Sequence, residues 1–190
     1  MSIPKNVLIS SAEQATMRKV LKEVAGDLTK NNIQFWLEGG SLLGWKRHNK
    51  KFIPWDDDID LQVRATQEQI QEIFDNPKYN IKSYFGARKT IKGKTRSPQV
   101  SLKGSKNWVD LFLVDENNKF RYHKEMPKYG INAFPSNISL TKTKLEGVNV
   151  NVPSQKDTLN YLNKYYKDWE NTAIIWNHKT KGKKIIVPLR

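Results

Sequence analysis

Residues 53–63 read Ile53-Pro54-Trp55-Asp56-Asp57-Asp58-Ile59-Asp60-Leu61-Gln62-Val63, so four aspartates lie within a mostly apolar segment. Apolar and polar residues alternate from Ile59 to Val63, which predicts a β-strand with one buried face. Successive side chains on a strand point to opposite faces. Asp58 and Asp60 are therefore expected on the same face, where their carboxylates can share one or two hard cations.

A run of aspartates usually forms a solvated turn, but this run lies between the apolar residues Trp55 and Ile59. Placing several carboxylates beside a hydrophobic core costs free energy unless a cation compensates. Mg²⁺ commonly binds through one or two carboxylates together with substrate phosphate oxygens, and two such ions about 3.5–4 Å apart clamp an in-line displacement at phosphorus. The run therefore predicts a magnesium site at Asp58 and Asp60, with Mn²⁺ as the alternative ion.

A third carboxylate for this site is expected at Asp110. It is the only charged residue in the strand-like segment Asn107-Trp108-Val109-Asp110-Leu111-Phe112-Leu113-Val114. A lone buried aspartate needs a partner. The metal ion is one such partner, and a lysine at the edge of the core is the alternative.

Gly39-Gly40-Ser41 lies between a strand predicted over residues 34–38 and a short helix expected from about Leu42. Glycine lets the backbone approach a phosphate closely, and the N-terminus of a helix favours anions. Ser41 adds a hydroxyl donor. Gly-Gly-Ser alone is a common turn, but its place before the aspartate run favours substrate binding by Gly40 and Ser41.

His48 and Trp55 each have two interpretations. His48 can polarise a phosphate, although a single histidine in a loop is more often simply exposed. Trp55 can stack on a base or pack in the core, and we favour the core.

The composition is that of one folded domain over residues 1–190. Apolar residues make up 37% of the sequence and aromatic residues 11%, more than a disordered chain carries. The absence of cysteine excludes disulfides and cysteine-based zinc sites. The sequence has no apolar run of membrane-spanning length and no signal-peptide pattern, so a cytoplasmic location is expected.

The net charge of +14 is unevenly distributed along the chain. Residues 1–77 carry 10 Lys and Arg against 11 Asp and Glu, whereas residues 78–190 carry 23 against 8. The basic half is expected to attract phosphates, an anionic polymer or a membrane surface; a solvated lysine-rich surface is the alternative. We expect a mobile basic loop over residues 86–97 and an exposed basic segment over residues 179–184.

Periodicity, capping residues and turn signals predict an α+β (α/β) fold in which helices flank a mixed β-sheet. Helices are expected over residues 11–30, 66–74 and onward from Ser154, the last with Leu159, Leu162 and Tyr166 on one face. Strands are expected over residues 34–38, 59–63, 79–85, 99–102, 108–114 and 148–152.

Several of these motifs resemble the LicD family and the related fukutin-like proteins. The family signature is Gly-Thr/Ser-Leu-Leu-Gly, then a basic residue, then Ile-Pro-Trp-Asp-Asp-Asp-Ile-Asp. Here it is matched by Gly40-Ser41-Leu42-Leu43-Gly44, Arg47-His48 and the Ile53–Asp60 run. Weaker likenesses in residues 108–112, 150–153 and 161–169 extend the resemblance over about residues 11–170, with Tyr166 where relatives often have glycine.

The resemblance implies a nucleotidyltransferase (polymerase-beta-like) core. It also implies transfer of a phospho-alcohol, such as phosphocholine, from a CDP-linked donor to a glycan hydroxyl, with release of CMP. By this resemblance Asp58 and Asp60 ligate the metal, Asp110 completes the site and deprotonates the acceptor, and Arg47 contacts a phosphate. Asp56 is placed with Gly40, Ser41 and Arg47 among the substrate-binding residues.

Two other functions are compatible with these residues. A nucleotidyltransferase acting on a small molecule, a protein or RNA would keep the fold and the aspartates, but would use a nucleoside triphosphate and release pyrophosphate. A non-enzymatic nucleic-acid-binding module would use the basic segments 89–96 and 179–184, and its affinity would fall steeply with salt. The aspartate run argues against nucleic acid, because carboxylates without a metal repel phosphates.

Overall fold

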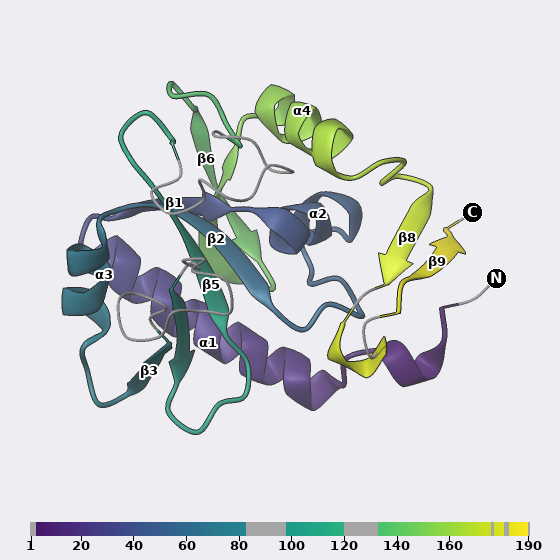
Figure 1. Cartoon of the computed structure of the whole chain (residues 1–190), viewed down its shortest axis with the longest axis horizontal. Coiled ribbons are helices and arrows are strands. Elements are labelled where there is room, and N and C mark those ends of the chain that lie inside the picture. The colour runs from purple at the N-terminus through teal and green to yellow at the C-terminus, as the bar shows by residue number, and fades with distance from the viewer. Residues whose placement is uncertain (1–2, 83–97, 120–132, 176, 181–182, 190) are drawn as a thin grey trace, which may run out of the picture.

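A mixed five-stranded sheet forms the centre of the molecule (Figure 1). The computed structural model describes residues 3–82, 98–119, 133–175, 177–180 and 183–189, so the predicted basic loop over residues 86–97 lies outside the described residues. β2 and β5 are parallel, and the other neighbouring strands are antiparallel, which confirms the predicted mixed sheet. In spatial order the strands are β1 (Gln34–Leu37), β2 (Ile59–Arg64), β5 (Val109–Val114), β4 (Gln99–Leu102) and β3 (Tyr79–Lys82).

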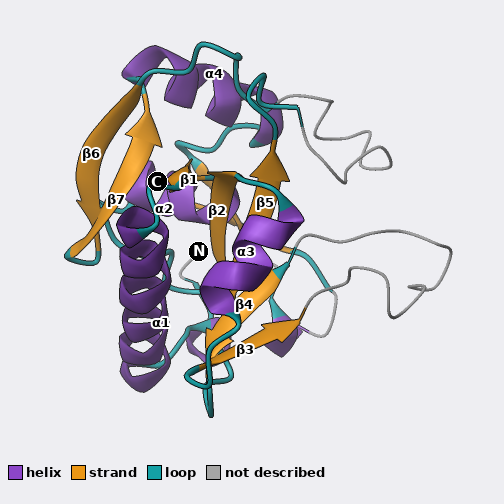
Figure 2. Ribbon diagram, turned by 90° about the vertical axis from the view of Figure 1, so that its left-hand side faces the viewer, coloured by secondary structure: helices purple, strands orange, loops and turns teal. Residues whose placement is uncertain are grey.

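Helix α1 (Ser11–Lys30) packs along the sheet, as Figure 2 shows. It begins with a capping box, in which the Glu13 backbone N–H donates to Ser10 Oγ and the Ser10 backbone N–H donates to the Glu13 carboxylate. This reciprocal pair satisfies two backbone donors at the start of the helix. One face of the helix is apolar and fully buried, and it consists of Met17, Val20, Leu21, Val24 and Leu28.

The residues of β2 and β5 divide between two faces of the sheet. One face is buried in the hydrophobic core and carries Ile59, Leu61 and Val63 from β2 and Val109 and Leu111 from β5. Asp60 and Asp110 point to the opposite face, because side chains alternate along a strand. The two aspartates are partners in the parallel register, so the pairing of these strands brings their carboxylates side by side.

Helix α2 (Gly39–Arg47) begins earlier than the sequence predicts. Gly39-Gly40-Ser41, expected as a break, forms the first turn of the helix, and Glu38 is the extended residue before it. The cost of glycine applies mainly to the interior of a helix, so two glycines are tolerated at its start. Strand β1 accordingly ends at Leu37 and not at Glu38.

Helices α3 (Gln67–Phe74) and α4 (Gln155–Tyr165) confirm two further predictions, and the side chains of Thr66 and Ser154 cap them. The buried residues of α4 are Thr158, Tyr161 and Leu162. Leu159 and Tyr166 are partly buried and pack against the core with Leu162, which supports the predicted face. The helix itself ends at Tyr165, and Tyr161 is buried as well.

Two hairpins complete the described strands. β6 (Leu140–Leu145) pairs with β7 (Val148–Pro153), and β8 (Thr172–Ile175) pairs with β9 (Ile185–Pro188). The sequence predicts β7 but not the other three, since β6 carries exposed lysines and β8 and β9 are short. Two 3-10 turns, η1 (Lys5–Val7) and η2 (His178–Thr180), lie near each other. Of the helices in the described ranges, none is both long and apolar enough to cross a bilayer.

Candidate active site

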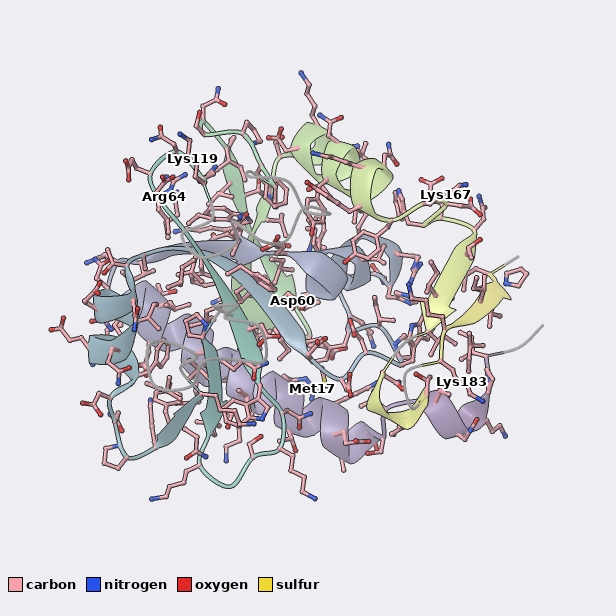
Figure 3. The ribbon with its side chains drawn as sticks, in the orientation of Figure 1. Met17, Asp60, Arg64, Lys119, Lys167 and Lys183 are labelled. Atoms are coloured by element: carbon pink, nitrogen blue, oxygen red, sulfur yellow. The ribbon has the colours of Figure 1, made fainter. Side chains whose placement is uncertain are left out.

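Three carboxylates meet where the parallel strands β2 and β5 begin, close to Asp60 at the centre of Figure 3. Asp58, Asp60 and Asp110 each offer an oxygen, and these oxygens lie within 4.8 Å of one another. Asp58 also belongs to a second such group with Asp56 and Asp57. A cluster of carboxylate oxygens suits a hard divalent cation, so the donor set fits Mg²⁺ or Mn²⁺. Metal ligation by these residues stays a prediction.

The electrostatics of the cluster favour the uptake of positive charge. Burial raises the pKa of Asp60 well above its ordinary value, and repulsion from Asp58 and then Asp110 adds to this. The pKa of Asp56 is likewise raised, first by burial and then by Asp58. Burial also raises the pKa of Asp58. A divalent cation would remove the repulsion that keeps these carboxylates from ionising together.

The two glycines of α2 allow the helix to approach these carboxylates. A Cβ on Gly39 would lie 2.2 Å from Asp60 Oδ2, and a Cβ on Gly40 would lie 2.2 Å from Asp56 Oδ2. The Gly40 backbone N–H donates to Asp60 Oδ2 over 3.1 Å. The start of the helix therefore binds an aspartate of the chain itself. The predicted contact between Gly40 and a substrate phosphate stays a prediction.

Ser41 makes a different contact from the expected one. Its Oγ accepts a hydrogen bond from the Asp60 backbone N–H over 2.9 Å, and the residue is 4% exposed. The hydroxyl thus helps to position the first residues of β2. Contact between Ser41 and a substrate stays a prediction, and the described geometry supports a positioning role.

Glu38 and Tyr161 lie beside the cluster, and the sequence does not predict either of them for the site. The Glu38 backbone N–H donates to Asp60 O, and its buried Oε2 has no hydrogen-bond partner among the described residues. Tyr161 OH accepts from the Gly39 backbone N–H over 3.2 Å. An acid at the end of a buried apolar run, directly before two glycines, is the signal that could have identified Glu38.

A cleft of about 440 Å³ opens onto the carboxylates. Its acidic side is lined by Asp56, Asp58 and Asp60. The opposite side comes from the end of α4, the segment that follows it and the β8–β9 hairpin, and it is aromatic and basic. Its residues include Tyr165, Tyr166, Lys167, Trp169 and Lys184. The cleft has the size of a small-molecule site and places cationic side chains opposite anionic ones.

Arg47, His48 and Trp55 form one packed group at the edge of this cleft. Arg47 Nη1 donates to the backbone carbonyls of Trp169 and Thr172, over 2.9 and 3.1 Å. Its Nε donates to His48 Nε2, and its guanidinium lies 5.7 Å from the centre of the Trp55 ring. Arg47 lines the cleft, so its predicted phosphate contact stays a prediction alongside this observed structural role.

His48 and Trp55 both pack against neighbouring side chains. The expectation of an exposed His48 is wrong: its ring is half-buried and meets Trp55 edge-on, with 5.5 Å between the ring centres. Burial lowers the pKa of His48 to about 4, and the neighbouring Arg47 adds to the shift. Trp55 is 4% exposed and belongs to the core, which confirms the favoured interpretation.

The family model described as LicD/FKTN/FKRP, nucleotidyltransferase domain, matches residues 32–155 of this chain. This range covers about two-thirds of the chain and contains all the carboxylates of the cluster. The chain belongs to the LicD/FKTN/FKRP family. The resemblance found in the signature residues is thereby confirmed.

Relatives from bacteria and mammals match different shares of this LicD/FKTN/FKRP chain. An uncharacterised protein of Rickettsia prowazekii is 33% identical over 182 residues, which is 91% of this chain and 62% of that protein. The ribitol-5-phosphate transferase FKTN of Macaca fascicularis is 26% identical over 92% of this chain and 37% of its own length. The human ribitol 5-phosphate transferase FKRP is 47% identical over 47 residues, 25% of this chain and 9% of its own. The chain spans 62% and 52% of the two Rickettsia relatives that it matches.

Arg47→Ala is expected to destabilise this LicD-family domain. The change removes two hydrogen bonds from a charged donor to backbone carbonyls, each of a kind worth about 1.5–3 kcal/mol, and it also removes the packing on Trp55. We expect a loss of about 2–4 kcal/mol in the free energy of unfolding, measured by urea denaturation. Arg47→Lys should recover little of the lost free energy of unfolding, because a single ammonium cannot reproduce the planar contact with Trp55. If the donor KM rises while stability stays that of the wild type, Arg47 acts on the substrate alone.

The metal-free protein is expected to lose stability as the pH rises from 6.5 to 8. Burial raises the pKa of Glu38 to about 8, against an ordinary value of 4.5. The folded state therefore holds this proton more tightly than the unfolded chain, so the free energy of unfolding falls with rising pH, by about 2 kcal/mol over this window. Below pH 6.5 the lowered pKa of His48 has the opposite effect: the unfolded chain binds this proton more tightly, so the free energy of unfolding rises with pH.

Thermal melts in a chelator at pH 6.5 and 8 measure this effect, which corresponds to about 4–8 °C for a chain of this size. In Glu38→Gln the fall in melting temperature between pH 6.5 and 8 should be smaller, because the neutral amide has no proton to lose. An equal fall in both proteins would place the titrating group elsewhere.

Proposed function

We propose that the protein transfers a phospho-alcohol from a CDP-linked donor to a glycan hydroxyl and releases CMP. The observation that carries the proposal is the meeting of oxygens from Asp58, Asp60 and Asp110 within 4.8 Å of one another, with Asp58 and Asp60 lining a cleft. Membership of the LicD/FKTN/FKRP family supports the same reaction class. The proposal covers the domain described here, which is only part of the length of its relatives.

In this proposal Asp58, Asp60 and Asp110 hold Mg²⁺, or Mn²⁺ in its place. The bound cation supplies charge neutralisation at the diphosphate. The chain's own residues do the positioning: Ser41 and Gly40 hold Asp60 in place, and Lys167 and Lys184 line the facing wall where donor phosphates would lie. Positioning and charge stabilisation are the main contributions of a protein to phosphoryl transfer.

The transfer itself forms one bond and breaks one bond. The acceptor oxygen bonds to the β-phosphorus, the bridge between the two phosphates breaks, and CMP leaves with the bridging oxygen. The hydroxyl proton passes to a base, for which Asp110 is the candidate because it shares the β2–β5 register with Asp60. The head group is either ribitol phosphate, as the names of FKTN and FKRP suggest, or phosphocholine.

The description of the family model as a nucleotidyltransferase domain favours one alternative. In this alternative a nucleoside triphosphate is the donor, the nucleotidyl group is transferred, and pyrophosphate leaves. The same carboxylates would serve, since both reactions act on a metal-bound polyphosphate. The released product therefore separates the two reactions more sharply than any feature of the site.

Donor binding and product analysis test the proposal. Calorimetric titration with Mg²⁺ present should show CDP-ribitol or CDP-choline binding at least about tenfold tighter than ATP or CTP, a difference of about 1.4 kcal/mol. Turnover with a glycan acceptor should release CMP. Release of pyrophosphate from CTP or ATP, with equal or reversed donor preference, would instead support nucleotidyl transfer.

A further inference from the structure

The outer face of the β8–β9 hairpin carries the large apolar side chains that are exposed in the described part of the chain. Ile174 is 48% exposed and Ile186 is 65% exposed, and these two residues are paired across the hairpin. The inner face of the hairpin, formed by Ala173, Ile175 and Val187, is buried. The hairpin is therefore anchored in the core on one side and presents an apolar pair on the other.

Lysines flank this apolar pair. Lys183 and Lys184 precede β9 and Lys167 precedes β8, and all three are exposed; Figure 3 labels Lys167 and Lys183 near opposite ends of the hairpin. From residue 171 to residue 190 the sequence has four lysines, one arginine and no acidic residue. In the sequence the acids that adjoin this stretch are Asp168 and Glu170, and Lys179 is already paired with Glu13. In space, Asp56, Asp58 and Asp60 line the same cleft as Ile174, so among the described residues of this region Lys167, Lys183 and Lys184 are the cations left to meet an anionic surface.

We propose that this hairpin face docks on an anionic lipid membrane. Aliphatic side chains that insert shallowly at headgroup level, with lysines beside them, match both the apolar and the anionic parts of such a surface. Two isoleucines are too few for a stable protein interface, which buries on the order of 800 Å² per partner. A soluble polyanion would use the lysines but would leave the isoleucines exposed.

The hairpin face continues into the cleft described above. Lys167, Ile174 and Lys184 belong to both, because they also line the cleft beside the aspartates. A membrane docked on the hairpin would therefore lie next to the mouth of the cleft. If the proposed transfer reaction holds, the acceptor would be a glycan carried on a lipid at that surface.

Vesicle sedimentation tests the docking without donor or acceptor, so its outcome is independent of the transfer reaction. The whole chain is mixed with vesicles of phosphatidylcholine alone or with about one-third phosphatidylglycerol, at about 0.1 M salt. We expect binding only to the anionic vesicles. The double variant Ile174→Asn, Ile186→Asn keeps every charge and should bind at least about tenfold more weakly. The double variant Lys142→Ala, Lys144→Ala removes two exposed lysines from the β6–β7 hairpin and should bind nearly as the wild type does.

Three outcomes would overturn the membrane proposal. The first is no binding to anionic vesicles by a protein that melts cooperatively. The second is equal binding by wild type and the isoleucine variant, together with full competition by polyphosphate, which would show a general attraction to polyanions. The third is a dimer in sedimentation velocity that the isoleucine variant dissolves, which would assign the face to a second copy of the chain.

Discussion

Asp58→Asn and Asp60→Asn are each expected to lower turnover at least about a thousandfold, which corresponds to roughly 4 kcal/mol of activation free energy. Asparagine has nearly the shape of aspartate but no charge, so it is a poor ligand for a hard cation. The oxygens of Asp58 and Asp60 lie in one group with Asp110, and the loss of either should empty the proposed metal site. The increase in melting temperature that Mg²⁺ gives the wild type should shrink or vanish in both variants.

Neither variant is expected to unfold. Burial raises the pKa of both Asp58 and Asp60; repulsion from Asp57 adds to the shift of Asp58, and repulsion from Asp58 and Asp110 adds to that of Asp60. A neutral amide should therefore leave the metal-free melting temperature unchanged or higher. Asp75→Asn, an exposed aspartate at the end of α3, is the matched control and should keep normal turnover. Turnover at the wild-type level in Asp58→Asn or Asp60→Asn would contradict the whole mechanism.

Asp110→Asn separates two roles for the third carboxylate. If Asp110 is the base, the variant should lose transfer while Mg²⁺-dependent donor affinity is largely kept. If Asp110 is mainly a ligand, donor affinity should fall as far as in Asp58→Asn and Asp60→Asn. Calorimetry and turnover on all three variants, compared side by side, distinguish these results.

Gly39→Ala is expected to have the second-largest effect, although it changes no chemical group of the site. Gly39 has φ +56°, a left-handed conformation that costs an alanine about 1–2 kcal/mol. Its new Cβ would also lie 2.2 Å from Asp60 Oδ2 and 2.8 Å from Asp60 Cγ. Asp60 must then move, and a displacement of about 1 Å in a catalytic group can cost about a hundredfold in rate.

We therefore expect Gly39→Ala to lose about 2–4 kcal/mol of unfolding free energy and at least about a hundredfold in turnover. Gly26→Ala is the matched control, because Gly26 lies inside α1 and a Cβ added there would have no atom within 4 Å. That change should stabilise the protein by roughly 0.5–1 kcal/mol. Normal activity and stability in Gly39→Ala would show that the close approach of α2 to Asp60 is not needed.

Local patterns predicted much of the fold and the centre of the site. Apolar spacing and capping residues identified α1, α3 and α4, because both signals act between residues three or four positions apart. Alternation along residues 59–63 placed Asp58 and Asp60 on one face, and the lone charge at Asp110 marked the neighbouring strand. The parallel register of Asp60 with Asp110 then required only that these two strands pair.

The roles of Glu38, Arg47 and Ser41 could not be predicted in this way. Glu38 was expected only as the end of a strand, but its carboxylate is buried beside Asp60. Arg47 resembled a phosphate ligand, but it donates to carbonyls more than 120 positions away in the chain. Ser41 was expected to donate a hydrogen bond to a substrate phosphate, but its hydroxyl accepts a hydrogen bond from the Asp60 backbone N–H.

The amino-acid sequence by itself determined the family, the strand that carries the aspartates and the expectation of a hard-cation site, because each depends on residues close together in the chain. The tertiary structure alone decided what faces that site. Helix α2 meets the aspartates through two glycines, and the segment after α4 and the β8–β9 hairpin contribute Lys167 and Lys184 to the cleft. These contacts join segments that are far apart in the sequence, and they form only when the core brings the segments together.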